Sequence, residues 1–299
     1  MATRIENKSF GGGIYLLISA LIYGLYGVYS RFIGASFGSF SQSWVRSFIV
    51  LMIVVVLLLV KKFEWKRIER KDIKWFLIWI IPTSIQPVIT FTAFNHLPLA
   101  TTYFLIYSTM IFGGVLSGKI FFSEKFNFAK GLSFLFIFVG LVLIYGSDIS
   151  LATNIYVVLA LISGLLVGFW NTLTKKVSTQ YSEFQMMSLD QFATMIVCGI
   201  GAFFFRETLP PPSNINAWFW IIVFAVSGVV TVFFLIRGFK YVEAQVGSLI
   251  LPMEIVFASI FGLLIFGEVL KLNTYLGGLF IVFAAILPAI GNKILGERK

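Results

Sequence analysis

Apolar stretches of about 20 residues follow one another along the whole chain, and they restrict its fold more than any other feature. A helix of about 20 residues, at 1.5 Å per residue, crosses the hydrocarbon core of a bilayer. Only 12% of the residues are charged, whereas soluble domains carry about 25%. So few charges cannot cover a water-exposed surface, so we predict an all-α membrane protein.

The apolar stretches predict ten transmembrane helices joined by short loops, with no soluble domain between them. The expected spans are residues 11–33, 41–60, 75–94, 99–118, 129–147, 152–174, 184–205, 216–236, 244–266 and 273–293. If the N-terminus is cytoplasmic, 19 of the 23 Lys and Arg residues lie on the cytoplasmic side, and only Arg31, Arg206 and Lys271 lie outside. This is the positive-inside pattern. We therefore expect a multi-pass protein of the inner (plasma) membrane, with both termini cytoplasmic.

The net charge of +10 does not indicate a nucleic-acid-binding protein, because the basic residues are distributed among the loops. They are not gathered on one soluble face, as a nucleic-acid partner requires. Membrane lipids are the expected surroundings, and a small-molecule substrate is the expected partner.

An internal repeat divides the chain. Residues 100–124 and 244–268 align without gaps at an offset of 144 and share seven identities, ending with Glu124 and Glu268. Residues 20–25 (ALIYGL) and 160–165 (ALISGL) also match at five of six positions. Each unit holds an odd number of spans, so the second copy enters the membrane from the opposite side. We predict two inverted five-helix repeats, residues 1–148 and 149–299, an architecture typical of transporters.

Residues 244–254 (AQVGSLILPME), which lead to Phe266-Gly267-Glu268, resemble the EamA repeat of the drug/metabolite transporter superfamily. The first copy, from Ala100 to Glu124, resembles it more weakly. The resemblance covers both halves and implies a central cavity through which amino acids or related metabolites are exported or exchanged. It does not identify the substrate.

Motifs for chemistry on bound groups are absent from the sequence. No G-x-x-x-x-G-K-[ST] segment for nucleotide phosphates occurs, so ATP does not drive the protein directly. One His and one Cys do not make a metal-binding cluster. We therefore expect no enzyme activity, no catalytic residues, no metal and no cofactor. A substrate gradient, a counter-substrate or a proton gradient would drive transport.

Three ionisable residues lie inside predicted spans, where a charge at the helix centre costs about 2.5–3.5 kcal/mol on insertion. Arg46 and Asp190 occupy equivalent positions of the two repeats. Arg46 either binds a substrate carboxylate or extends to the outer headgroups, and Asp190 is open to similar alternatives. Glu254 lies near the middle of its span, two residues after Pro252. Proline leaves a carbonyl without its helical donor, so we favour Glu254 as a site for an ammonium group or a proton over a purely structural role.

Polar residues also recur at helical spacing, which places them on common faces. These faces are expected to line a polar, aromatic cavity, although hydrogen bonds between helices are an alternative for any single residue. The faces comprise Ser19, Tyr23, Tyr26 and Ser30; Gln86 and Thr90; Tyr103 and Tyr107; and Ser163, Trp170, Asn171 and Thr174. The predicted substrate-binding residues are Glu254, Tyr23, Trp170, Asn171, Tyr107, Gln86 and Arg46.

Other residues have simpler interpretations. Gly164-x-x-x-Gly168 and Gly114-x-x-x-Gly118 predict close helix packing. Glu124 and Glu268, beside Lys125 and Lys271, predict helix caps or loop contacts. Five tryptophans near span ends are expected to lie at the membrane interface: Trp65, Trp75, Trp79, Trp218 and Trp220.

These features predict a secondary transporter of small metabolites that works by alternating access. Amino acids are the leading substrate class, and export is preferred to uptake. Two alternatives remain open: uptake or exchange of a nucleotide-like or other cationic metabolite, and a non-transporting membrane scaffold.

Overall fold

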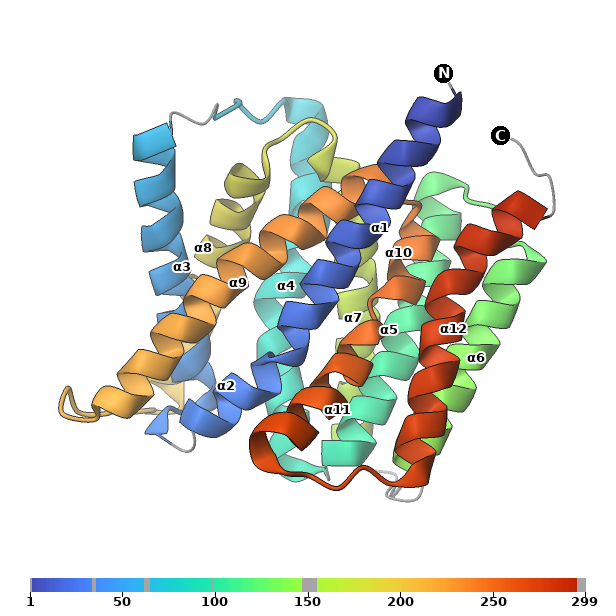
Figure 1. Cartoon of the computed structure of the whole chain (residues 1–299). Coiled ribbons are helices and arrows are strands. Elements are labelled where there is room, and N and C mark those ends of the chain that lie inside the picture. Colours follow the sequence, from blue (N-terminus) through green and yellow to red (C-terminus); the bar gives the residue numbers. More distant parts are fainter. Residues whose placement is uncertain (1, 34–35, 62–64, 98, 147–154, 295–299) are drawn as a thin grey trace.

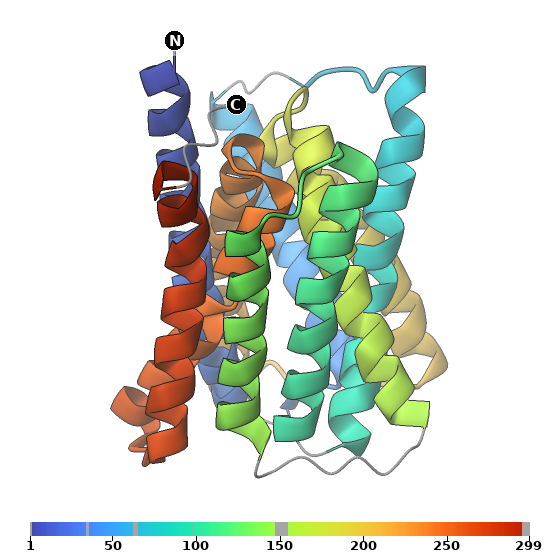
Figure 2. The ribbon, with the colours of Figure 1, turned by 90° about the vertical axis from the view of Figure 1, so that its right-hand side faces the viewer.

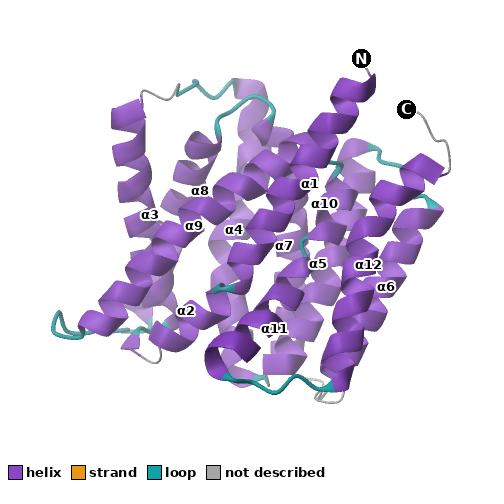
Figure 3. Cartoon of the chain, viewed as in Figure 1, coloured by secondary structure: helices purple, strands orange, loops and turns teal. Residues whose placement is uncertain are grey.

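The computed structural model describes residues 2–33, 36–61, 65–97, 99–146 and 155–294. Within these residues the chain forms twelve α-helices and no strands (Figure 3). The helices are α1 (Ala2–Gly24), α2 (Tyr26–Ile33), α3 (Ser39–Lys61), α4 (Arg70–His96), α5 (Leu99–Phe122), α6 (Phe128–Tyr145), α7 (Ile155–Ser178), α8 (Glu183–Phe204), α9 (Ile215–Tyr241), α10 (Ala244–Ile250), α11 (Met253–Phe266) and α12 (Leu272–Ile294). The helices form one bundle, and α1 begins at the end where α12 finishes (Figure 1). We call this the upper end, and the opposite end the lower end.

Nine helical segments in the described part of the chain are long and apolar enough to cross a membrane. The first joins α1 and α2 as Ser9–Ile33, and the ninth joins α10 and α11 as Ala244–Phe266. The apolar part of α12, Leu272–Pro288, is shorter than the other spans. The all-helical class is thus confirmed. The predicted number of ten spans is not, because the described residues contain nine such spans and one shorter apolar helix.

Two of the expected continuous spans are broken in the middle of the bundle (Figure 3). The first span breaks at Leu25, between α1 and α2, and the ninth breaks at Leu251 and Pro252, between α10 and α11. Pro252 has no N–H to continue the helical ladder, so α10 ends there. The first break lies against α11: a Cβ on Gly24 would lie 3.2 Å from the backbone oxygen of Glu254, two residues after Pro252.

The two halves of the bundle pack on each other in a reciprocal way (Figures 1 and 2). Helix α1 packs along α9 and α11, and its repeat counterpart α7 packs along α4 and α5. Helix α3 pairs with its counterpart α8, and α6 pairs with α12. Exchange of the halves therefore reproduces these helix contacts.

Glycines allow α5 and α7 to approach closely, as their spacing predicted. A Cβ on Gly168 would lie 2.8 Å from the backbone nitrogen of Gly114, and one on Gly164 would lie 2.9 Å from the carbonyl carbon of Ile106. Small residues thus form the seam between the two halves.

Trp79 was wrongly predicted to lie at the membrane interface. Its side chain is fully buried, and its Nε1 donates a hydrogen bond to Oγ1 of Thr174 at 2.8 Å. The reason is that α4 packs along α7 at this point. Position along a span does not reveal which face meets a neighbouring helix.

Ion pairs and caps close the upper end of the bundle. Glu124 accepts hydrogen bonds from the backbone nitrogens of Ala244 and Gln245 at 2.7 and 2.9 Å, and it pairs with Lys175 at 3.0 Å. Buried Lys130 pairs with Glu243 at 2.8 Å. Glu124 is therefore a helix cap, as expected, but it caps α10 of the other half, and its cation is Lys175 instead of Lys125.

Candidate functional site

A cavity of about 840 Å³ lies between the two halves of the bundle. Its wall includes side chains from α1, α3, α4, α5, α7, α8 and α11. All seven residues predicted from the sequence line it: Tyr23, Arg46, Gln86, Tyr107, Trp170, Asn171 and Glu254. The structure thus brings them to one cavity, while their part in substrate binding stays a prediction.

The cavity extends toward the lower end. Its wall there includes Phe37 and Gly38, which precede α3, and Ser39, the first residue of α3. Glu207, which follows α8, belongs to the same part of the wall. Glu207 accepts hydrogen bonds from the backbone nitrogens of Phe40 and Ser41 at 3.2 and 2.6 Å. The ion pairs of Glu124 and Lys130 lie at the opposite end of the bundle, and neither residue belongs to the wall of the cavity.

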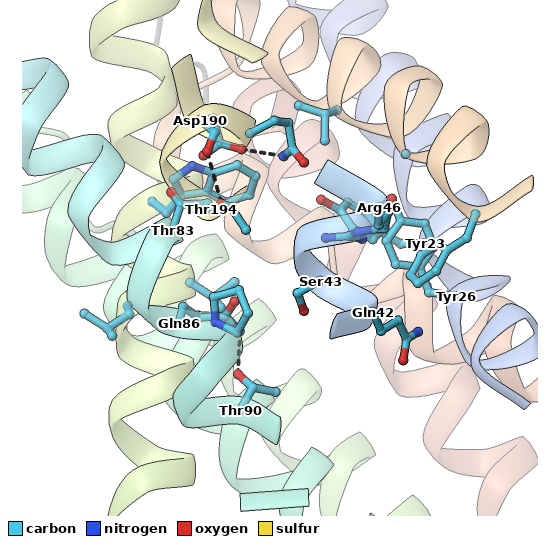
Figure 4. A pocket seen from close by; sticks show the side chains of 18 of the residues that line it. Tyr23, Tyr26, Gln42, Ser43, Arg46, Thr83, Gln86, Thr90, Asp190 and Thr194 are labelled. Atoms are coloured by element: carbon cyan, nitrogen blue, oxygen red, sulfur yellow. Dashed lines mark hydrogen bonds between the residues drawn. The ribbon is translucent and has the colours of Figure 1, made fainter. Parts of the chain in front are cut away.

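Arg46 lies on α3, on the side of the cavity formed by Tyr23 and Tyr26 (Figure 4). The carbon of its guanidinium lies 4.7 Å from the ring centre of Phe224 and 6.0 Å from that of Tyr26. Among the described residues no carboxylate pairs with Arg46. Its guanidinium is therefore held by aromatic faces, with hydrogen bonds left for a ligand.

Glu254 lies in the first turn of α11, directly after the break at Pro252. Its side chain is partly exposed in the cavity, and the hydroxyl of Tyr107 on α5 interacts with its carboxyl group. The break therefore places a carboxyl group from the second half against a tyrosine from the first half.

Asp190 lies on α8, across the cavity from Arg46 (Figure 4). Its side chain is only 1% exposed. Oδ2 accepts a hydrogen bond from Nε2 of Gln191 at 2.8 Å, and the indole of Trp170 and the hydroxyl of Thr83 also interact with the carboxyl group. Asp190 is thus a cavity residue that the sequence placed at a matching repeat position but did not distinguish from a structural carboxylate.

A hydrogen-bonded cluster joins α4 to α7 beside the cavity. Nε2 of Gln86 donates to Oγ1 of Thr90 at 2.6 Å, and the hydroxyls of Thr90 and Ser163 lie 2.5 Å apart. Gln86 and Thr90 line the cavity, and Figure 4 shows them on the same helix one turn apart. This cluster both links the halves and presents polar atoms to the cavity.

Other predicted polar positions have a packing role. The hydroxyl of Ser19 donates to the backbone oxygen of Thr231 on α9 at 3.1 Å, and Thr174 accepts the hydrogen bond of Trp79. The side chain of Ser30 lies outside the described residues. For Ser19 and Thr174, the alternative of a bond between helices is the one observed.

Several cavity residues were not among the predicted binding residues. Gln42 and Ser43 line the cavity from α3, and Thr194 lines it from α8. Gln42 lies four residues before Arg46, and Thr194 four residues after Asp190, so each shares a helical face with the charged residue. That spacing is the signal by which they could have been found.

The chain is similar to a known protein family and to a solved structure. The model of the EamA-like transporter family matches residues 10–146 and 154–289. A solved structure titled only "Crystal structure of protein" is similar in fold, with a TM-score of 0.81 and 12% identity, over 94% of this chain and 98% of the other. At that identity the likeness concerns the fold alone. No curated protein matches the chain.

Proposed function

Because the chain belongs to the EamA-like transporter family, and is thus a multi-pass membrane transporter of small molecules, we propose that it exports amine-bearing metabolites, above all amino acids. The observation that carries this proposal is one cavity that contains a guanidinium from the first half of the chain and carboxyl groups from the second half. Amino acids carry the complementary pair of charges.

The proposed topology has ten spans, with α12 as the tenth. Helix α12 contains 23 residues, which corresponds to about 34 Å at 1.5 Å per residue and is long enough for a bilayer. Residues 1–148 and 149–299 form the two inverted halves. The protein spans the inner membrane with both termini on the cytoplasmic side. The reason is that the described basic loops lie mainly at the upper end, where α1 begins and α12 ends.

In this topology the upper end is cytoplasmic and the cavity faces outward. Alternating access requires a second state in which the upper end opens and the lower end closes. The reciprocal contacts of α1 with α9 and of α7 with α4 support this exchange, because the two states would use equivalent surfaces.

The charges of the cavity support an amino acid substrate. Among its described lining residues, Arg46 is the one Lys or Arg, whereas Asp190, Glu207 and Glu254 supply three carboxyl groups. In this proposal Arg46 binds the substrate carboxylate through charge-assisted hydrogen bonds, and Glu254 binds the ammonium group. A proton or a counter-substrate supplies the driving force.

The charge balance also bears on the alternatives. A nucleotide-like substrate would bring phosphates, which prefer clusters of Arg and Lys, to a cavity wall that is richer in carboxyl groups. Cationic metabolites without phosphate fit the carboxyl groups and the aromatic rings, so their uptake or exchange remains the second candidate. A scaffold would gain nothing from Glu254 in a cavity.

Flux into liposomes tests the proposal directly. Purified protein is reconstituted with an amino acid inside, and exchange of labelled amino acids is compared with exchange of their decarboxylated and deaminated analogues. We expect amino acids to exchange fastest, because only they satisfy Arg46 and Glu254 together. Arg46→Gln should abolish the preference over decarboxylated amines, while Arg206→Gln, the same change in the exposed loop after α8, should keep it. Flux of amines alone would favour the cationic alternative, and no flux of any of these compounds would contradict the proposal.

A further inference from the structure

Two ammonium groups converge on one tryptophan ring where α4 begins and α7 ends, at the upper end of the bundle (Figure 2). Nζ of Lys74, on α4, lies 5.4 Å from the ring centre of Trp75, and Nζ of Lys176, on α7, lies 4.9 Å from it. Nζ of Lys176 also lies 5.9 Å from the ring centre of Phe122, the last residue of α5. Aromatic faces attract cations, but the two cations repel each other, so an anion beside them would stabilise the arrangement.

The protein does not supply this anion from the described part of the chain. Neither Lys74 nor Lys176 forms an ion pair there, and both side chains are exposed. Asp72, two residues before Lys74, instead accepts a hydrogen bond from the hydroxyl of Tyr181 at 2.8 Å. Glu124 is bound to the start of α10 and to the lysine that precedes Lys176. The two ammonium groups are therefore open to an anion from the surroundings.

Cations on one face of α4 are followed by exposed apolar residues on the same face. Arg70, Lys74 and Ile78 follow one another at intervals of four residues, and Ile81 comes three residues later, so the four share a face. Arg70 and Lys74 are exposed, and the side chains of Ile78 and Ile81 are 43% and 52% exposed. Cations above a lipid-facing apolar surface, beside a tryptophan, are typical of the headgroup level of a membrane. The surface thus matches a phospholipid, whose phosphate lies above its acyl chains.

The segment that leads into α4 is held in place by α8 and by the loop before it. The side-chain amide of Gln185, on α8, accepts a hydrogen bond from the backbone nitrogen of Lys66 at 3.1 Å and donates one to its backbone oxygen at 2.6 Å. The hydroxyl of Tyr181 accepts a hydrogen bond from the backbone nitrogen of Glu69 at 3.2 Å. The start of α4 is therefore fixed before a ligand arrives, which lowers the entropic cost of binding.

We propose that Arg70, Lys74 and Lys176 bind the headgroup phosphate of an anionic phospholipid, with its acyl chains along Ile78 and Ile81. Basic pockets between transmembrane helices bind such headgroups. A zwitterionic phospholipid brings an ammonium group of its own to the three cations, so it binds more weakly. Lys74 and Lys176 come from the two halves of the chain that match the family, so the bound lipid joins these halves at the upper end. The inference does not depend on which substrate is transported.

Native mass spectrometry of the full-length protein in detergent tests this site. The wild type is titrated with phosphatidylglycerol, which is anionic, or with phosphatidylethanolamine of the same acyl chains, which is zwitterionic. We expect the first phosphatidylglycerol molecule to bind at least about tenfold more tightly, because the cations attract its net charge. Equal affinity for the two lipids would overturn the proposal. Displacement of phosphatidylglycerol by an equal concentration of inorganic phosphate would show a site for small anions and would also overturn it.

Variants connect the lipid preference to the two lysines. Lys74→Gln combined with Lys176→Gln removes both charges at Trp75, so we expect the preference for phosphatidylglycerol to fall below about threefold. Lys74→Arg combined with Lys176→Arg keeps the charges and should keep the preference. The matched control is Lys125→Gln combined with Lys240→Gln, the same loss of charge at the upper end but in the loop after α5 and on α9, which should also keep it. An unchanged preference in the first variant would place the lipid elsewhere and refute the site.

Discussion

Lys175 and Glu124 form an ion pair of 3.0 Å at the upper end of the bundle, and Arg31 and Glu268, each displaced by 144 positions, form the equivalent pair at the lower end. Each pair joins one half of the chain to the other. The side chains of Lys175 and Glu124 are 23% and 8% exposed. Those of Arg31 and Glu268 are 53% and 42% exposed. The same contact thus exists in a buried form at the upper end and in an exposed form at the lower end, toward which the cavity extends.

We expect Glu124→Gln to favour opening of the upper end. The substitution removes the charge of the carboxylate that pairs with Lys175. The same carboxylate accepts two backbone hydrogen bonds from the start of α10. Hydrogen bonds to charged groups contribute about 1.5–3 kcal/mol, so the closed state should lose a stabilisation of that order. The measurement is the maleimide labelling rate of Ser248→Cys, a position on α10 that is 2% exposed, in a Cys198→Ala background. The rate should rise at least about fivefold.

Glu268→Gln is the matched control for this experiment. The exposed pair with Arg31 contributes only about 0–1 kcal/mol, and its loss should not expose Ser248→Cys. Equal labelling of the Glu124→Gln and wild-type backgrounds would mean that the upper closure does not depend on this pair.

Glu254→Gln tests the proposed ammonium site. The substitution keeps the size of the side chain and its hydrogen bonds but removes the charge. We expect flux of amine-bearing substrates to fall by about tenfold or more, which corresponds to about 1.4 kcal/mol. If Glu254 also couples transport to protons, the variant should lose its dependence on the proton gradient and retain exchange. Glu183→Gln, at the start of α8 and outside the cavity, is the control. Wild-type flux with unchanged pH dependence would assign Glu254 a structural role.

Tyr23→Ala tests the aromatic wall. The ring of Tyr23 lies 4.7 Å from that of Tyr26 at the cavity, and an aromatic face next to a cation contributes about 0.5–2 kcal/mol. We expect apparent substrate affinity to fall by about three- to thirtyfold, while the yield and melting temperature of the purified protein change little. Tyr275→Ala, at a side chain of α12 that is 54% exposed, should leave affinity unchanged. An equal loss of folded protein and of affinity would indicate that Tyr23 acts in packing.

Gly168→Ala should destabilise the seam between α5 and α7. The added Cβ would lie 2.8 Å from the backbone nitrogen of Gly114, and backbone cannot move aside as a flexible side chain can. Overpacking of this kind costs about 1–3 kcal/mol, which thermal unfolding in detergent would detect. Gly199→Ala is the control, because a Cβ there has no atom within 4 Å. A melting temperature that is equal for the two variants would refute the tight seam.

The orientation is tested by cysteine labelling from each side of the membrane. We expect a cysteine at Pro211, in the loop before α9, to react with an impermeant reagent from outside. A cysteine at Trp65, before α4, should react only after the membrane is permeabilised. Labelling of Trp65→Cys from outside would show that the proposed orientation, or the number of spans before residue 65, is wrong.

The sequence by itself determined that this chain is helical, enters the membrane many times and contains two related halves. These properties depend on local patterns: the length of apolar runs, the spacing of polar residues along a helix, and matches such as Glu124 with Glu268. Lipid enforces helices in such runs because every backbone group must find its partner within the segment. The faces that carry Tyr23, Gln86 and Trp170 were predictable for the same reason.

The tertiary structure alone decided which polar groups pair. Glu124 pairs with Lys175, 51 residues away, instead of its neighbour Lys125, and Trp79 donates to Thr174, 95 residues away. These outcomes depend on how α4, α5 and α7 pack, and spacing within one helix contains no information about the helix that it meets. The physical reason is that hydrogen bonds act over about 3 Å, so a partner is set by contacts between segments far apart in the chain.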